Sequence, residues 1–291
     1  MTDMIRTMPL MGGKVVVAVH DVDHPSAEAF FSDIFDDLEK EGRRIQGIFD
    51  FFDPGSELAK LNRERDIKAS KELAEVIGKG LSYSSETEGR YDITIGRRTL
   101  ARKQGKELPD ITSTYHDVKV SGRRISLLHP DALLDLGSIA KGYAADRIID
   151  YMAGLGIEGG LVDARGDMRV FGPRTETVAI QHPRDRQRTI NPFLLRDASV
   201  ATSGDYNQYY GSYETSHLVG ESDFCSVTVV GDLLADADAI ASCVYFLGSA
   251  QAAKFLHLHP EVKAYAIDRS LNEYSYNGFR KILVQEACHG G

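Results

Sequence analysis

The sequence predicts an α+β fold in which antiparallel strands pack against helices. Two segments, 26–46 and 70–87, carry apolar residues at helical spacing. Short β-rich runs lie among the helical segments without the regular strand–helix alternation that produces a doubly wound parallel sheet. The 291 residues, 42% of them hydrophobic, suffice for a large core, and no repeat or linker divides them. We therefore expect one domain over residues 1–291.

Sequence signals mark where the helices begin and end. In the first helix the inward residues recur every three or four positions: Phe30, Phe31, Ile34, Leu38 and Ile45. For the second helix, Ser70 is a suitable N-cap residue and Gly89 lies just beyond its end. A helix is also expected at 234–247, extended by another through His257.

The predicted strands are short and bounded by turn residues. A hairpin is expected where 118–120 and 125–127 flank Ser121–Gly122. Residues 14–20 are expected to form a strand after the Gly12–Gly13 turn. The remaining expected strands are 175–182, 196–202, 206–218, 224–231 and 262–268.

Charge and cysteine content exclude several classes of protein. The formal net charge of -9 argues against nucleic acid as a partner, and no basic run interleaved with aromatics offsets it. The three cysteines are too far apart for a CxxC metal or redox motif. Neither a signal peptide nor a membrane-spanning run is evident, so the sequence predicts a cytoplasmic protein.

The densest motif is Asp135-Leu-Gly-Ser-Ile-Ala-Lys141-Gly-Tyr. It is interpreted as a carboxylate at a strand end, a turn of small residues, and a lysine in the first turn of a helix. Backbone N–H groups at such a turn can face phosphate, and the lysine adds a positive charge. A capped helix with a surface lysine fits the same residues equally well.

A second motif places oxygen ligands on one face of a helix. Asp238 and Ser242 in the stretch from Asp236 are four residues apart, so both side chains are available to a hard cation such as Mg²⁺. The alternative is structural: acidic residues at the beginning of a helix also complement its dipole. Taken alone, the spacing favours that alternative.

Two further segments are weaker signals. The polar turn 201–206 is followed by His217, and a histidine after a strand is more often structural than catalytic. The segment 89–96, GRYDITIG, is interpreted as a strand that follows Gly89. This strand lies either against a ligand or at the beginning of a sheet.

Taken together and in this order, these segments resemble the ApbE family of FAD:protein FMN transferases. The resemblance extends from Met11 to about residue 248, nearly the whole chain. It is carried by Met11-Gly12-Gly13, by the segment 52–62, and by GRYDITIG, LDLGSIAKGYAADR, ATSGDY, His217 and ADADAIASCVYFLG.

The resemblance implies an ApbE-like, T-fold-like mixed fold that binds FAD as substrate together with Mg²⁺. The residues implied to contact FAD are Met11, Phe52, Arg90, Tyr91, Asp92, Asp135, Lys141 and His217. The implied Mg²⁺ ligands are the main-chain carbonyl of Ser138 and the side chains of Asp238 and Ser242. Asp238 is also expected to be essential for catalysis, and His217 is the candidate general base or proton relay.

The implied activity is transfer of FMN from FAD to a Ser or Thr hydroxyl of an acceptor protein, with release of AMP. Two alternatives stay open: hydrolysis of FAD to FMN and AMP, and FAD binding without catalysis. The chain departs from the family pattern at three places. The LVGESDF segment replaces a common Asp-Pro-x-Thr-Gly turn, RRTLARKQGKELP lacks the usual tryptophan, and Arg165 replaces the first glycine of a Gly-Gly-Asp pattern.

Overall fold

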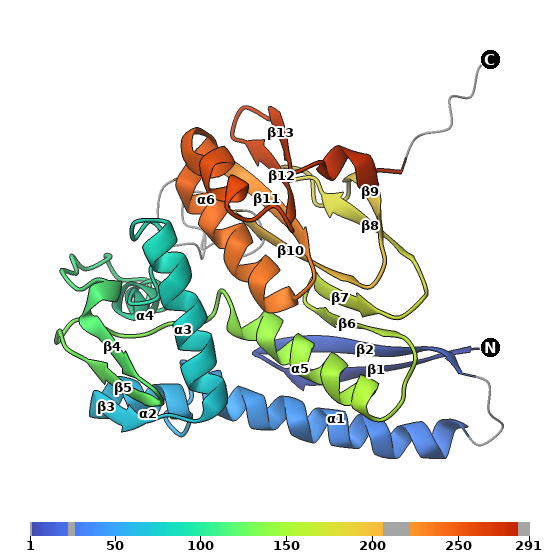
Figure 1. Ribbon diagram of the computed structural model, residues 1–291, viewed down its shortest axis with the longest axis horizontal. Helices are drawn as coiled ribbons and strands as arrows, with labels where there is room; N and C mark the ends of the chain where they lie inside the picture. The colour runs from blue at the N-terminus through green and yellow to red at the C-terminus, as the bar shows by residue number, and fades with distance from the viewer. Residues whose placement is uncertain (1, 23–26, 206–221, 285–291) are drawn as a thin grey trace.

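An eight-stranded antiparallel sheet forms the centre of the protein (Figure 1). The computed structural model describes residues 2–22, 27–205 and 222–284. In spatial order the strands are β1 (Thr2–Leu10), β2 (Gly13–Val22), β6 (Gly160–Ala164), β7 (Asp167–Phe171), β10 (Ala198–Gly204), β11 (Phe224–Gly231), β12 (Lys263–Asp268) and β13 (Glu273–Tyr276). The chain thus leaves the sheet after β2 and returns to pair with that strand at β6.

Three helices cover one face of this sheet (Figure 1). Helix α1 (Ala27–Phe49) contacts β1, α5 (Ala140–Gly154) contacts β6 and β7, and α6 (Leu234–His257) contacts β10 and β11. The apolar stripe of α1 is buried against its neighbours, as the helical spacing of residues such as Phe35 and Leu38 requires. Most of the hydrophobic core lies in this layer.

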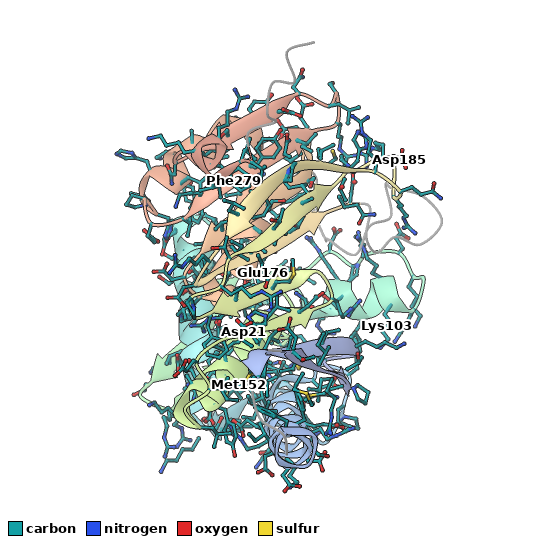
Figure 2. All side chains as sticks on the ribbon, turned by 90° about the vertical axis from the view of Figure 1, so that its right-hand side faces the viewer. Asp21, Lys103, Met152, Glu176, Asp185 and Phe279 are labelled. Carbon is teal, nitrogen blue, oxygen red and sulfur yellow. The ribbon has the colours of Figure 1, made fainter. Side chains whose placement is uncertain are left out.

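The hairpin of β8 (Glu176–Gln181) and β9 (Thr189–Leu195) belongs to a smaller core on the other side of the sheet, together with Phe279 and Tyr265. In Figure 2 this hairpin faces the viewer, with Glu176 at the beginning of β8 and Asp185 in the turn before β9. Because β11 packs against both cores, all of its residues are buried.

The segment between α1 and α5 forms a smaller unit beside one end of the large sheet (Figure 1). It contains a three-stranded sheet in the order β3-β5-β4. Its elements are α2 (Glu57–Glu64), β3 (Asp66–Lys68), α3 (Lys71–Glu86), α4 (Gly96–Lys103), β4 (Val118–Ser121) and β5 (Arg124–Leu127). Two short 3₁₀ turns, η1 (Tyr115–Asp117) and η3 (Phe279–Ile282), complete the described elements.

Most of the predicted elements are confirmed. Ser70 caps α3 by accepting a 3.1 Å hydrogen bond from the Leu73 N–H. Strands β4 and β5 form the hairpin expected around Ser121–Gly122. The long helix α6 changes direction at Gly248, where φ is 65°, in agreement with the two successive helices expected there. The predicted strand 206–218 lies outside the described residues.

Two predictions about secondary structure were wrong. The segment 89–96 is a turn rather than a strand, because the Asp92 carboxylate accepts hydrogen bonds from the backbone N–H groups of Thr94 and Tyr115. Asp135 follows an isolated bridge between Ile95 and Leu133 instead of a full strand. The sequence interpretation also missed β1 and α4.

The expectation that no segment approaches a membrane-spanning run was also too strict. Among the described helices, α6 is long and apolar enough to cross a membrane. More than half of its apolar window is buried inside the fold, as in the core helix of a globular protein. Its composition therefore reflects its central position between α5, α3 and the sheet.

Helices α5 and α6 cross at very short range. A Cβ atom added to Gly142 of α5 would lie 2.4 Å from the carbonyl oxygen of Leu234, at the beginning of α6. Only glycine permits this approach, and the obstacle is backbone that no side-chain rotation can move. The crossing fixes where the first turns of both helices lie.

The crossing predicts a large effect of one methyl group. Gly142→Ala should lower the free energy of unfolding by about 2 kcal/mol or more, because α5 and α6 must separate to accept it. Gly78→Ala is the matched control, since Gly78 lies in α3 with no atom within 4 Å of the added Cβ. That variant should gain about 0.5–1 kcal/mol from helix propensity. Urea denaturation of both variants tests this, and equal effects would contradict it.

Candidate active site

A cleft of about 1060 Å³ opens between the large sheet and the smaller unit. One wall consists of the β1–β2 and β6–β7 turns and β10 of the large sheet, together with β8 and α6. The segment after α1, the turn 89–95 and helix α4 contribute the opposite wall. The N-terminal part of α5 lies between them.

The structure brings the predicted site residues together in this cleft. Those that line it are Met11, Phe52, Arg90, Tyr91, Asp92, Asp135, Ser138, Lys141, Asp238 and Ser242. They come from segments that span the chain from the β1–β2 turn to α6. His217, the candidate general base, lies outside the described residues. Proximity is thus established for ten predicted residues, and their individual roles stay predictions.

At the floor of the cleft, the Lys141 ammonium contacts two carboxylates. Its Nζ lies 2.8 Å from Oδ2 of Asp167 and 2.8 Å from Oδ2 of Asp238. Burial raises the pKa of Asp238, the charge of Asp167 adds to this effect, and Lys141 opposes it. Burial alone would lower the pKa of Lys141, but the two carboxylates raise it overall. With both acids ionised, the three residues carry one net negative charge.

Asp167 was not among the residues predicted for the site. It follows the Arg165–Gly166 turn at the beginning of β7, and its Oδ1 accepts a 2.9 Å hydrogen bond from the Thr202 N–H of β10. In the sequence it is the aspartate of the Gly-Gly-Asp pattern that Arg165 alters, but it has no spacing relation to Lys141 or Asp238. Only the pairing of β7 with β10 reveals its place.

Hydroxyl groups surround the ion pairs. Ser203 and Ser242 share a 3.0 Å hydrogen bond, and the hydroxyl of Tyr91 lies 2.9 Å from Oγ of Ser138. Burial strongly raises the pKa of Tyr91, so its hydroxyl is neutral and able to donate a hydrogen bond. The floor of the cleft is therefore rich in oxygen atoms.

Asp92 and Asp135 are engaged in organising the loops that line the cleft. Asp135 accepts hydrogen bonds from Thr99 Oγ1 at 2.7 Å and from the Gly137 N–H at 2.9 Å. Asp92 accepts from Thr94 and Tyr115, although burial raises its pKa overall. These two carboxylates hold α4 and the turn before α5 in place.

The rim formed by α4 and the segment after α1 is aromatic and basic. Phe51 and Phe52 pack edge to face with centroids 5.0 Å apart, and the Lys103 ammonium lies 3.2 Å from the centroid of Phe52. Arg98 and Arg102 also line the cleft from α4. The basic residues of GRRTLARK recur at helical spacing, a signal that could have identified α4 from the sequence.

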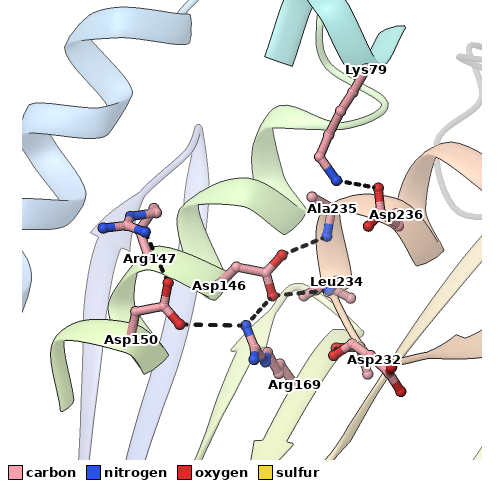
Figure 3. A network of polar contacts seen from close by, with 10 residues as sticks. Lys79, Asp146, Arg147, Asp150, Arg169, Asp232, Leu234, Ala235 and Asp236 are labelled. Carbon is pink, nitrogen blue, oxygen red and sulfur yellow. Dashed lines mark hydrogen bonds and ion pairs between the residues drawn. The ribbon is translucent and has the colours of Figure 1, made fainter. Parts of the chain in front are cut away.

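A carboxylate from α5 holds the beginning of α6 (Figure 3). Asp146 accepts 2.9 Å hydrogen bonds from the backbone N–H groups of Leu234 and Ala235, and its Oδ1 lies 2.7 Å from Nη1 of Arg169. It thereby satisfies donors that the first turn of a helix leaves unpaired. Burial raises the pKa of Asp146 despite these contacts. The contacts of Asp146 with Leu234, Ala235 and Arg169 are called the clamp below. The clamp lies near Lys141 along α5 and near Asp238 along α6.

Comparison with solved structures identifies the fold. The flavin transferase ApbE from Vibrio cholerae superposes with a TM-score of 0.80 at 21% identity, covering 97% of this chain and 99% of that one. The ApbE protein from Thermotoga maritima gives a TM-score of 0.84 at 20% identity, covering 98% and 100%. The chain therefore has the α+β fold of the ApbE flavin transferases, as the sequence predicted.

Sequence comparison gives the family. The model of the ApbE family matches residues 11–284, so the chain belongs to the ApbE family. The FAD:protein FMN transferase of Vibrio cholerae is 25% identical over 260 residues, covering 78% of each protein. The FAD:protein FMN transferase of Escherichia coli K12 is 25% identical over 251 residues, covering 75% of this chain and 71% of the relative. The family resemblance predicted from the motifs is confirmed, and its named relatives are transferases.

The clamp at the beginning of α6 predicts unequal effects of two substitutions on α5. Asp146→Asn should lower the free energy of unfolding by about 2–4 kcal/mol, because it breaks a buried ion pair and weakens one of the two backbone contacts. Asp150→Asn is the control, since Asp150 faces Arg169 at 4.0 Å and is about half exposed. Its effect should stay within about 0.5 kcal/mol. Chemical denaturation that ranked the two variants alike would contradict the clamp.

Proposed function

We propose that this chain is a Mg²⁺-dependent FAD:protein FMN transferase. It moves FMN from FAD to a Ser or Thr hydroxyl of an acceptor protein and releases AMP. The observation that carries the proposal is the Lys141–Asp167–Asp238 cluster at the floor of a large cleft. The names of the relatives support the same activity.

The cleft suits a dinucleotide in size and lining. Its volume, about 1060 Å³, is at the upper end of the range for small-molecule sites. Ile180 of β8, Phe49 at the end of α1 and Phe52 after that helix offer surfaces for planar rings. The polar floor offers hydrogen bonds and charge for phosphates.

The donor set at the floor fits Mg²⁺, which prefers oxygen ligands and retains waters and substrate phosphates. Within the described part of the chain, no group of three or more His, Cys, Asp or Glu side chains could hold a metal. The fit therefore depends on one carboxylate, that of Asp238, together with the Ser242 hydroxyl and the main-chain carbonyl of Ser138. The net negative charge of the ion-pair cluster supports a cation here. When bound, Mg²⁺ would neutralise charge on the phosphate oxygens.

The proposed reaction is a displacement at phosphorus. A bond forms between the acceptor hydroxyl oxygen and the phosphorus of FMN, and the bond from that phosphorus to the bridging oxygen breaks. The bonding electron pair leaves with AMP, and the hydroxyl proton passes to a base, for which His217 is our candidate. Lys141 adds positive charge at the phosphates and holds the Asp238 carboxylate in place.

The test is incubation with FAD, Mg²⁺ and a peptide that carries a candidate Ser or Thr acceptor. Mass spectrometry should show the peptide gaining the mass of FMN, and AMP should appear in equal amount. Release of AMP and free FMN without peptide modification would identify a pyrophosphatase instead. FAD binding without either product would refute both activities.

Substituting the proposed metal carboxylate should abolish turnover and leave the fold intact. Asp238→Ala should reduce Mg²⁺-dependent AMP release by about two orders of magnitude or more. Lys141 keeps Asp167 as a partner in that variant, so the buried ammonium stays paired. Asp236→Asn is the control on the same helix, since Asp236 contacts Lys79 and Tyr83 outside the cleft. Unchanged AMP release in Asp238→Ala would refute the metal assignment.

The candidate base should affect transfer more than binding. His217→Ala is expected to slow FMN transfer by about 10²-fold or more and to weaken FAD binding by a much smaller factor. Single-turnover transfer and titration of flavin fluorescence measure the two quantities separately. A parallel loss of both would show that His217 binds FAD or supports the fold.

A further inference from the structure

Two similar turns lie side by side at the mouth of the cleft. Met11–Gly12 joins β1 to β2, and Arg165–Gly166 joins β6 to β7. All four residues have positive φ, at 52°, 70°, 70° and 98°, as tight two-residue hairpins of this type require. Because β2 and β6 are paired neighbours, both turns reach the same end of the sheet, and both line the cleft.

Arginine is an unfavourable choice at position 165. A side chain is strained at φ 70°, whereas glycine adopts this conformation freely. The turn itself is supported elsewhere, because the Asp163 carboxylate accepts a 2.6 Å hydrogen bond from the Gly166 N–H. The arginine side chain is thus not required to close the turn. Strained residues of this kind concentrate at ligand-binding sites.

Gly13, which follows the neighbouring turn, has no side chain and so leaves space for Arg165. A Cβ atom added to Gly13 would lie 2.6 Å from Cδ and 3.0 Å from Nε of Arg165. The stem of Arg165 therefore crosses directly over the backbone of Gly13, at the beginning of β2. Beyond this contact Arg165 is exposed, and it lines the cleft.

Arg165 also differs from Lys141 in whether carboxylates contact its positive charge. Lys141 already contacts two carboxylates, so with both acids ionised the ion-pair cluster is negative overall. Within residues 2–22, 27–205 and 222–284, no hydrogen bond or ion pair joins the Arg165 guanidinium to another side chain. Asp167, a member of the cluster, is only two residues away along the chain. Among the described residues, a positive charge without an ion-pair partner therefore lies in the same cleft as the ion-pair cluster.

We propose that Arg165 binds the pyrophosphate of FAD through its guanidinium group. This inference rests on the proposed function and adds a substrate-binding residue to it. The planar guanidinium donates two parallel hydrogen bonds to phosphate oxygens. It also supplies the attraction that the negative cluster by itself does not offer to an anionic substrate. The backbone strain at position 165 is then the cost of placing this charge at the mouth of the cleft.

The test compares binding and stability in matched variants. In the presence of Mg²⁺, Arg165→Gly should raise the Kd for FAD about tenfold or more. The Kd for riboflavin, which has no phosphate, should stay within about twofold. The melting temperature should equal or exceed that of the wild type, because glycine relieves the strain. Arg165→Lys should recover part of the lost affinity.

Leu271→Gly is the control for backbone strain. Leu271 is exposed in the turn between β12 and β13 and has φ 65°, close to the value at Arg165. Replacing it should relieve similar strain and leave the Kd for FAD unchanged. Isothermal titration calorimetry and thermal denaturation measure both effects in all variants.

Three results would overturn the assignment. These are unchanged FAD affinity in Arg165→Gly, an equal loss of FAD and riboflavin affinity, and an effect confined to the KM of the acceptor peptide. A wild-type protein that binds FAD but transfers no FMN would refute the proposed function alone. Wild-type transfer together with unaltered FAD affinity in Arg165→Gly would refute the Arg165 assignment alone.

Discussion

The contact between α5 and α6 is the constraint on which the cleft depends. Gly142 lets the two helices touch at backbone distance, and Asp146 binds the first two N–H groups of α6. Each helix then carries one partner of the central ion pair, Lys141 on α5 and Asp238 on α6. A shift of either helix would therefore change the distance between the ammonium and the carboxylate.

The sheet supplies the third charge independently of the helices. Asp167 stands at the beginning of β7 and is fixed by the backbone of β10 through Thr202. The ammonium of Lys141 thus connects the helical layer to the sheet. One cation between two acids keeps these layers together, and with both acids ionised it leaves one excess negative charge in the cleft, which would favour a cation there.

The sequence predicted the fold class and most helices because their signals are local. Apolar spacing, the Ser70 cap and the Ser121–Gly122 turn depend only on neighbouring residues. Motif resemblance then identified ten residues that share the cleft. Asp167 was missed because its partners are distant in sequence, and the strand expected around Asp92 was wrong because side-chain hydrogen bonds fold that segment into a turn. The single-domain organisation stays a prediction.

The order of strands in the large sheet has a consequence for biosynthesis. Strand β2 ends at Val22, and its second neighbour, β6, begins only at Gly160. During translation the N-terminal hairpin therefore emerges long before the strand that covers its open edge. For that interval its apolar residues, including Met8 and Val17, lack their final neighbours. The nascent chain is then exposed to intermolecular strand pairing, and a chaperone that shields the hairpin would raise the yield of native protein.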